Sequence, residues 1–113
     1  MKWAKLVQMG CELPEVEEST WFRTPSLKVR GKGFCRLRED GESVVFMVES
    51  VDAQEALIAA RPELFFITDH YRGYASVLAH LRKLRVAEAR ERLRVAWRCK
   101  APRSLLKQTG ELI

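Results

Sequence analysis

The chain has 113 residues, of which 47% are hydrophobic and 31% are charged. This length and composition predict one folded domain over residues 1–113 and exclude a disordered or low-complexity chain. No apolar stretch is long enough to cross a bilayer, so we expect no membrane contact. The three cysteines, Cys11, Cys35 and Cys99, form no CxxC pair, which favours free thiols in a reducing cytoplasm.

The net charge of +5 is unevenly distributed along the chain. Residues 82–107 contain ten basic and two acidic residues, a net charge of +8, whereas residues 1–81 carry a net charge of −2. Such a basic segment indicates a surface for phosphate, nucleic acid or an acidic protein. A solvated helix face whose charges form salt bridges explains the same pattern equally well.

The first half of the chain predicts a helix followed by an antiparallel meander. Residues 2–11 form the helix, and the acidic PEVEES segment is expected to be a turn that leads to a strand near residues 20–23. The segments LKVR and GFCRLRE predict a hairpin that turns at Gly31-Lys32. Asp40-Gly41 then turns the chain into SVVFMVE, whose apolar run indicates a central strand.

The second half predicts three helices and a further strand. Asp52 and Glu55 are expected to form the capping box of a helix that buries Ala56, Leu57 and Ala60. ASVLAHLRKL predicts a strand, and a short helix is expected at residues 103–108. VAEARERLRVAWRC predicts a longer helix that buries Val86, Ala89, Leu93, Ala96 and Trp97 at helical spacing. The sum is an α+β domain, in which an N-terminal helix and C-terminal helices pack on a mainly antiparallel sheet.

The segment TDHYRGY, residues 68–74, concentrates polar and aromatic side chains. Asp69 and His70 are adjacent, so they point to opposite sides of an extended chain, and no nucleophile accompanies them at a recognisable spacing. Two interpretations remain open. In one, the segment is a turn in which Tyr71 and Tyr74 pack while His70 and Arg72 face water; in the other, it is a ligand-binding loop. No metal-ligand spacing appears, so we expect no metal, no cofactor and no catalytic residue.

Two basic surfaces are predicted. Arg36 and Arg38 alternate on one strand and therefore point to one face, close to Lys32 at the hairpin turn. This face is either a wing that contacts nucleic acid or an ordinary solvated face or guarded edge of the sheet. Arg90, Arg94 and Arg98 lie four residues apart along the flank of the last long helix, where Glu91 can pair with Arg94 and Glu88 with Arg92. Cys35, Cys99, Trp97 and the pair Trp21-Phe22 are expected in the core, with an exposed stacking pair as the alternative for Trp21-Phe22.

The order of the motifs LPEVEES, TPSLKVRGKGF, RLREDG and FFITDHYRGY, followed by an Arg-rich helix that runs into WRCKAPRSL, resembles the MmcQ/YjbR-like family of small bacterial proteins. The similarity extends over roughly residues 13–106. It implies a domain of the double-wing type, in which hairpins flank a helical layer, and a DNA-binding function. Relatives often carry a Trp-Gly or Tyr-Gly step where this chain reads Trp21-Phe22.

Three functional hypotheses follow. The first is a non-catalytic module that binds nucleic acid, with DNA as the partner, through phosphate contacts from Lys32, Arg36, Arg38, Arg90, Arg94 and Arg98. The second is a module for protein interaction or for a small anionic ligand, with a groove lined by Trp21, His70, Tyr71 and Arg72. An enzyme is the least supported, because it needs a pocket that brings His70 to a serine or cysteine.

Overall fold

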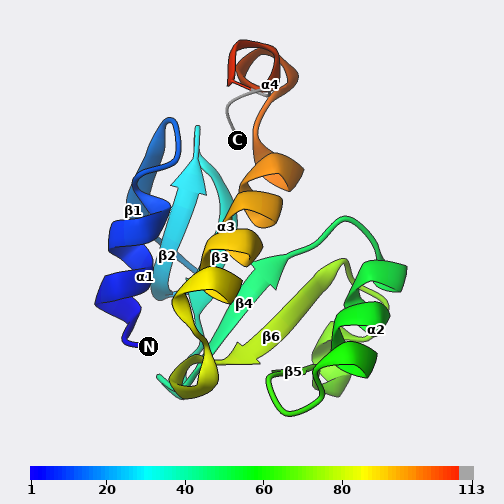
Figure 1. Cartoon of the computed structure of the whole chain (residues 1–113). Coiled ribbons are helices and arrows are strands. Elements are labelled where there is room, and N and C mark those ends of the chain that lie inside the picture. The colour runs from blue at the N-terminus through cyan, green and yellow to red at the C-terminus, as the bar shows by residue number, and fades with distance from the viewer. Residues whose placement is uncertain (110–113) are drawn as a thin grey trace.

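The computed structural model describes residues 1–109 and shows an α+β fold with one six-stranded sheet (Figure 1). The strands follow one another across the sheet in the order β1-β2-β3-β4-β6-β5, and every neighbouring pair is antiparallel. The strands are β1 (Val16–Trp21), β2 (Thr24–Val29), β3 (Lys32–Leu37), β4 (Ser43–Met47), β5 (Phe65–Phe66) and β6 (Ser76–His80). The helices are α1 (Trp3–Gly10), α2 (Val51–Ala60), α3 (Val86–Lys100) and α4 (Arg103–Thr109), with 3-10 turns at η1 (Asp69–Tyr71) and η2 (Leu81–Lys83).

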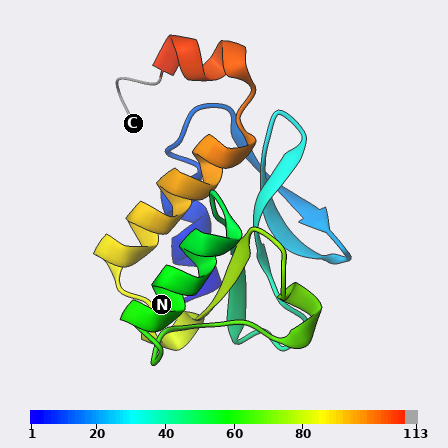
Figure 2. The ribbon, with the colours of Figure 1, turned by 90° about the vertical axis from the view of Figure 1, so that its right-hand side faces the viewer.

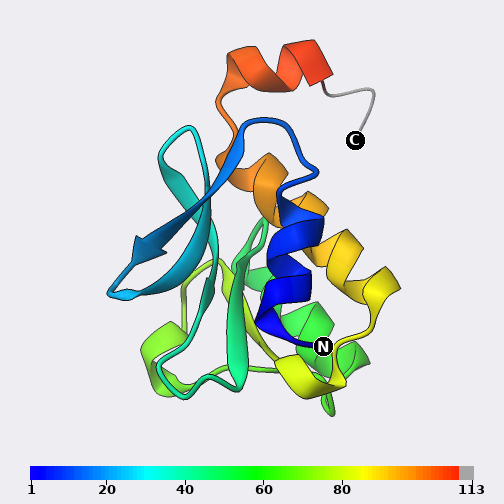
Figure 3. The same cartoon turned by 90° about the vertical axis from the view of Figure 1, so that its left-hand side faces the viewer.

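The three longest helices lie on one side of the sheet, and η1 lies on the other (Figures 2 and 3). The core between α1, α3 and the sheet is closed by Trp97, which is fully buried and donates from Nε1 to the carbonyl oxygen of Pro14 at 2.9 Å. Gly10 brings α1 close to β2, because a Cβ there would lie 2.5 Å from Cδ1 of Leu27. A smaller cluster of Val45, Leu78 and Tyr71 lies beneath η1 on the opposite face.

The antiparallel meander over β1 to β4 is confirmed, with two local corrections. The acidic segment predicted as a turn is largely strand, since β1 begins at Val16 and pairs Glu17 with Lys28 of β2. Pairing with β2 outweighs the weak strand preference of glutamate, and an edge strand leaves such side chains in water. The β2–β3 turn lies one residue earlier than predicted, at Arg30 and Gly31, both of which have positive φ, so Lys32 begins β3.

The cap and the buried side of α2 also differ from the prediction. Ser50 is the N-cap, because its Oγ accepts a hydrogen bond from the backbone N–H of Ala53 at 3.0 Å. Asp52 lies in the first turn instead. Ala56 and Ala60 are exposed, whereas Gln54 is buried. Its amide finds backbone acceptors beyond the helix, which a sequence pattern based on hydrophobicity does not register.

The other predicted elements are confirmed except that the strand expected over ASVLAHLRKL ends at His80, and Leu81–Lys83 form the 3-10 turn η2. Asp40 closes the turn before β4 by accepting hydrogen bonds from the N–H groups of Glu42 and Ser43 at 2.8 and 3.0 Å. α3 buries Ala89, Leu93, Ala96 and Trp97 as expected, but Val86 at its start is 47% exposed. No helix within residues 1–109 combines the length and the apolar character needed to cross a bilayer.

α4 is attached to the hairpin tip of the sheet. Leu105 is buried, and Arg30 donates from Nη1 to Ser104 Oγ at 3.2 Å. The same guanidinium forms two hydrogen bonds of 2.8 Å with the carboxylate of Glu15. Arg30 is therefore engaged in holding three segments together.

Candidate nucleic-acid interface

The TDHYRGY segment is a structural turn that α2 holds against the sheet. Nε2 of Gln54 lies 3.2, 2.9 and 2.7 Å from the carbonyl oxygens of Tyr71, Tyr74 and Ser76. The two N–H groups of this buried amide are shared among three backbone acceptors, of which the Tyr71 and Tyr74 carbonyl groups also accept the N–H groups of Tyr74 and Ser76. Gly73 has a φ of +83°, which agrees with the expected turn.

The side chains of this segment have different surroundings. Tyr71 is buried, whereas His70 and Arg72 face water and Arg72 pairs with Asp69 at 2.9 Å. Tyr74 is 66% exposed, so the expectation that its ring packs is wrong. The segment contributes one buried ring and presents its polar groups outward.

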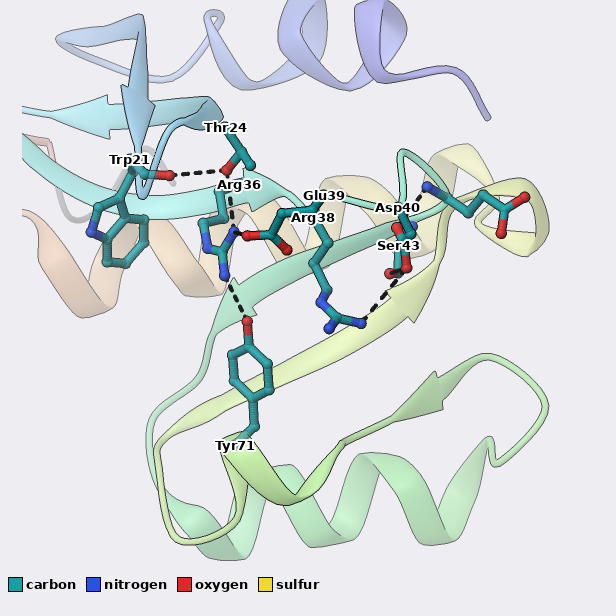
Figure 4. Close-up of polar contacts among 9 residues, drawn as sticks. Trp21, Thr24, Arg36, Arg38, Glu39, Asp40, Ser43 and Tyr71 are labelled. Atoms are coloured by element: carbon teal, nitrogen blue, oxygen red, sulfur yellow. Dashed lines mark hydrogen bonds and ion pairs between the residues drawn. The ribbon is translucent and has the colours of Figure 1, made fainter.

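Arg36 is the partner of Tyr71, and the two join β3 to this turn (Figure 4). Nη2 of Arg36 donates to the Tyr71 hydroxyl at 2.7 Å, and Nη1 lies 3.2 Å from Thr24 Oγ1. Nη1 also lies 3.4 Å from Glu39, a side chain that is 64% exposed. Arg36 itself is only 8% exposed, so these internal contacts occupy the guanidinium.

Arg38, the residue after the end of β3, also contacts Tyr71. Its Nη1 is 3.7 Å from Asp40, and its guanidinium carbon is 5.9 Å from the centre of the Tyr71 ring. The two arginines of the predicted hairpin surface thus support the packing of Tyr71. Among the hairpin cations that were predicted to bind phosphate, Lys32 is the exposed one.

The arginines on the flank of α3 also differ from one another. Arg94 pairs with Glu91 at 2.6 Å, and Arg92 pairs with Glu88 at 3.5 Å, which confirms both predicted helix pairs. Arg90 is exposed, and among the described residues no carboxylate lies within ion-pair distance of it. Arg98 is exposed and lines a hollow that it shares with Glu49.

Lysines from the hairpin and from the end of α3 meet at one hollow of about 430 Å³, which we call the lysine hollow. Lys28 and Lys32 come from the β2–β3 hairpin, and Lys100 is the last residue of α3. No aspartate or glutamate lines it; the remaining lining residues are Trp21, Gly31, Gly33, Cys99 and Ala101. Three ammonium groups without a carboxylate in the lining favour an anionic ligand.

The indole of Trp21 forms one wall of the lysine hollow. It lies against the backbone of β3, since a Cβ at Gly33 would be 2.5 Å from Cε3 of the indole. Cys99 lies in the same lining, and burial raises the pKa of its thiol, with Glu49 adding to this effect and Lys100 and Arg92 opposing it. The hollow therefore presents cations and an aromatic ring rather than a thiolate nucleophile.

The residues predicted to line one ligand groove lie at different places in the structure. Figure 4 shows Arg36 between Trp21 and Tyr71. Trp21 lines the lysine hollow, whose lining includes neither His70, Tyr71 nor Arg72. Trp21 and Phe22 are not in the core as expected: Trp21 is half-buried and Phe22 is 69% exposed.

Sequence patterns did not reveal two further features. Lys28 and Lys100 were not singled out, because only the packing of α3 against the hairpin brings them together. A second basic group lies around two hollows between α1 and η2, where Lys2 and Lys5 meet Arg82, Lys83 and Arg85. Within residues 1–109, no three His, Cys, Asp or Glu side chains are arranged to hold a metal ion.

Two mycobacterial proteins resemble part of this chain. They are the uncharacterized proteins Rv2570 of Mycobacterium tuberculosis and Mb2600 of Mycobacterium bovis, each 34% identical over 67 residues. The match covers 59% of this chain and 52% of each relative, so the chain spans about half the length of these curated relatives.

A solved structure and a family sequence model extend the comparison to most of the chain. The crystal structure of protein DR2400 from Deinococcus radiodurans, described as a DUF419 domain, superposes with a TM-score of 0.74 at 19% identity. The superposition covers 96% of this chain and 88% of that one, which shows a shared fold. The sequence model of the YjbR family matches residues 11–99. The chain therefore belongs to the YjbR family.

Proposed function

We propose that this protein is a non-catalytic nucleic-acid-binding protein whose contact surface is centred on the lysine hollow. One observation carries the proposal: Lys28 and Lys32 of the hairpin and Lys100 of α3 line one hollow without a carboxylate. Of the six cations predicted to contact phosphate, Lys32 lines this hollow, and Lys100 adds the end of α3 to it. Arg90 and Arg98 extend the positive charge along the exposed side of α3.

The chemistry of the hollow suits the phosphate backbone of DNA or RNA. Lysine ammonium groups attract phosphate as point charges and carry no information about base sequence. Binding of this kind releases condensed counterions, so the affinity falls steeply with salt. The double-wing, DNA-binding character implied by the family resemblance is part of this proposal, with the β2–β3 hairpin as one wing.

The absence of catalysis is part of the same proposal and is supported by how the reactive groups are engaged. The Tyr71 hydroxyl is engaged by Arg36, and the Gln54 amide is engaged by backbone carbonyl groups. Burial raises the pKa of the Cys35 thiol well above its usual value, which keeps this thiol protonated. Arg36 and Arg38 act as supports for the hairpin, and the lysines of the hollow make the contact.

The test is charge reversal at the hollow, compared with charge reversal at the second basic group. The variant Lys32→Glu/Lys100→Glu and the control Lys5→Glu/Lys83→Glu change the net charge equally, at two different places. Lys28 is left unchanged because Glu17 is its cross-strand neighbour in β1. Fluorescence anisotropy with labelled oligonucleotides at about 50 mM and about 200 mM salt measures the affinity and its salt dependence.

We expect the wild-type protein to bind, with an affinity that falls by roughly one log–log unit of salt per phosphate contact. The hollow variant is expected to lose at least about tenfold in affinity, and the control variant much less, with unchanged circular dichroism for both. Equal losses in the two variants would mean that net charge alone attracts the nucleic acid. No binding by the wild-type protein at low salt would refute the proposed function.

A further inference from the structure

Phe22 is an exposed aromatic side chain on a strained turn. Its side chain is 69% exposed, and its backbone has a φ of +53°. The next residue, Arg23, has a φ of +65°, so both residues of the β1–β2 loop adopt the left-handed conformation that favours glycine. Residues other than glycine adopt this conformation only at a cost in free energy. An exposed phenyl ring on such a turn contributes little to the core, and backbone strain of this kind points to a functional role.

The ring of Phe22 is oriented by its neighbours. It stacks on the indole of Trp21 with the ring centres 5.4 Å apart and the planes inclined by 28°. The guanidinium carbon of Arg36 lies 5.3 Å from its centre. Thr24 Oγ1 donates to the carbonyl oxygen of Trp21 at 2.9 Å and closes the loop. The phenyl ring is therefore held beside Trp21, which is itself a wall of the lysine hollow.

We propose that Phe22, seated on Trp21, is a stacking platform for an unpaired nucleobase, and that the protein prefers single-stranded to double-stranded nucleic acid. This inference rests on the proposed function, because the phosphates of the same strand lie along the lysine hollow. Arg23, exposed at the loop tip, adds a cation next to the ring. Proteins that bind single strands combine these two elements, a basic groove and aromatic rings on which bases stack.

The preference for a single strand follows from the accessibility of the base faces. In a duplex, each base is covered on both faces by its neighbours, so an exposed phenyl ring gains nothing from it. In a single strand, a base turns its face outward and stacks on the ring whatever its identity. Cations alone would favour the duplex, which has the higher charge density. A higher affinity for the single strand than for the duplex would therefore indicate that a base stacks on Phe22.

The experiment compares four probes with three variants. The probes are short labelled oligonucleotides: single-stranded oligo-dT, oligo-U, an abasic single strand of the same length and a duplex. The variants are Phe22→Ala, the conservative Phe22→Tyr and the control Tyr74→Ala, which removes another exposed aromatic ring outside the lining of the hollow. Anisotropy titrations at low salt give the affinities.

We expect Phe22→Ala to weaken binding of oligo-dT or oligo-U by at least about fivefold, since a stacked base contributes at least that much. Binding of the abasic strand and the duplex should stay unchanged, and Phe22→Tyr and Tyr74→Ala should behave like the wild type. Comparing oligo-dT with oligo-U shows whether DNA or RNA is the better source of the base. If all probes bind but Phe22→Ala affects none selectively, the platform is refuted and the proposed function stands. If no probe binds to the wild type, nucleic-acid binding itself is refuted, and the stacking platform with it.

Discussion

At the scale of single residues, the pair Arg36 and Tyr71 explains the TDHYRGY segment. A guanidinium that is only 8% exposed needs acceptors, and its nearest carboxylate, Glu39, is an exposed side chain 3.4 Å away. The neutral Tyr71 hydroxyl at 2.7 Å is the closer partner. Gln54 holds the backbone of the segment in the position that presents this hydroxyl. The signature segment is thus a support for β3, the strand that begins with Lys32.

This pairing predicts that Tyr71→Phe destabilises the fold. Removing the hydroxyl leaves a buried N–H of Arg36 without an acceptor, which costs roughly 1–3 kcal/mol of unfolding free energy. Urea denaturation followed by circular dichroism measures this loss. Tyr74→Phe is the matched control, because the Tyr74 ring is 66% exposed and its hydroxyl has water available. Equal stability of Tyr71→Phe and the wild type would show that water reaches Arg36.

At the scale of elements, local signals were sufficient where the partners are close in the sequence. The Asp40-Gly41 turn closes on the next residues, and the buried positions of α3 recur at helical spacing, so both were predicted. Only the last residues of β1 were predicted as a strand. Its acidic residues form a strand because they pair with β2, and the sequence alone does not show this pairing. The buried position of Gln54 depends on acceptors 17 to 22 residues away, which no local pattern contains.

The candidate site shows the same limit. Lys32 was predicted as a phosphate contact because it lies at a recognisable hairpin. The joining of Lys28 and Lys32 with Lys100 arises from packing between the hairpin and the end of α3, elements that are far apart in the sequence. The burial of Arg36 likewise comes from Tyr71, 35 residues away. The alternation along the strand predicts to which face of the sheet Arg36 points, but it does not show that Tyr71 covers this side chain.

The cap of α2 gives a prediction at this scale. Ser50→Ala removes the side-chain acceptor for the Ala53 N–H and should lower the unfolding free energy by about 1 kcal/mol. Asp52→Ala should cost less, since Asp52 only places a negative charge in the first turn. Thermal and urea denaturation of both variants measure the difference. A larger loss from Asp52→Ala would reverse the assignment of the cap.

At the scale of the whole molecule, arginines partner several surface carboxylates. The hydrogen bond from Arg30 lowers the pKa of Glu15, the bond from Arg61 lowers that of Glu63, and the bond from Arg94 lowers that of Glu91. A carboxyl group whose pKa is lowered by folding binds protons more readily in the unfolded chain. These pairs therefore favour the folded state only while the carboxylates are charged. The buried Cys35 has the opposite shift, because burial raises the pKa of its thiol.

These shifts predict a plateau of stability with two edges. The contribution of the carboxylates is complete above the ordinary glutamate pKa of 4.5 and is lost as the pH falls through the lowered values. The contribution of Cys35 is complete below the ordinary thiol pKa of 9.0 and decreases as the pH rises above it. Melting temperatures measured from pH 3 to pH 10 should fall at both ends.

Variants separate the two edges of the plateau. In Glu91→Gln the melting temperature should fall less at acidic pH, because the amide does not titrate. In Cys35→Ala the melting temperature should be lower throughout but should fall less at alkaline pH. A melting temperature that stays constant down to pH 3 would contradict the acidic edge. An unchanged alkaline edge in Cys35→Ala would assign that edge to other groups.

The contact between Trp97 and Pro14 has a consequence for the order in which the chain is made. The two residues are 83 positions apart, and α1, at the start of the chain, packs against α3 near its end. During synthesis, the whole meander leaves the ribosome before the helix that covers its apolar side. The growing chain therefore exposes that side until the last long helix emerges, and closure of the core waits for a contact across most of its length.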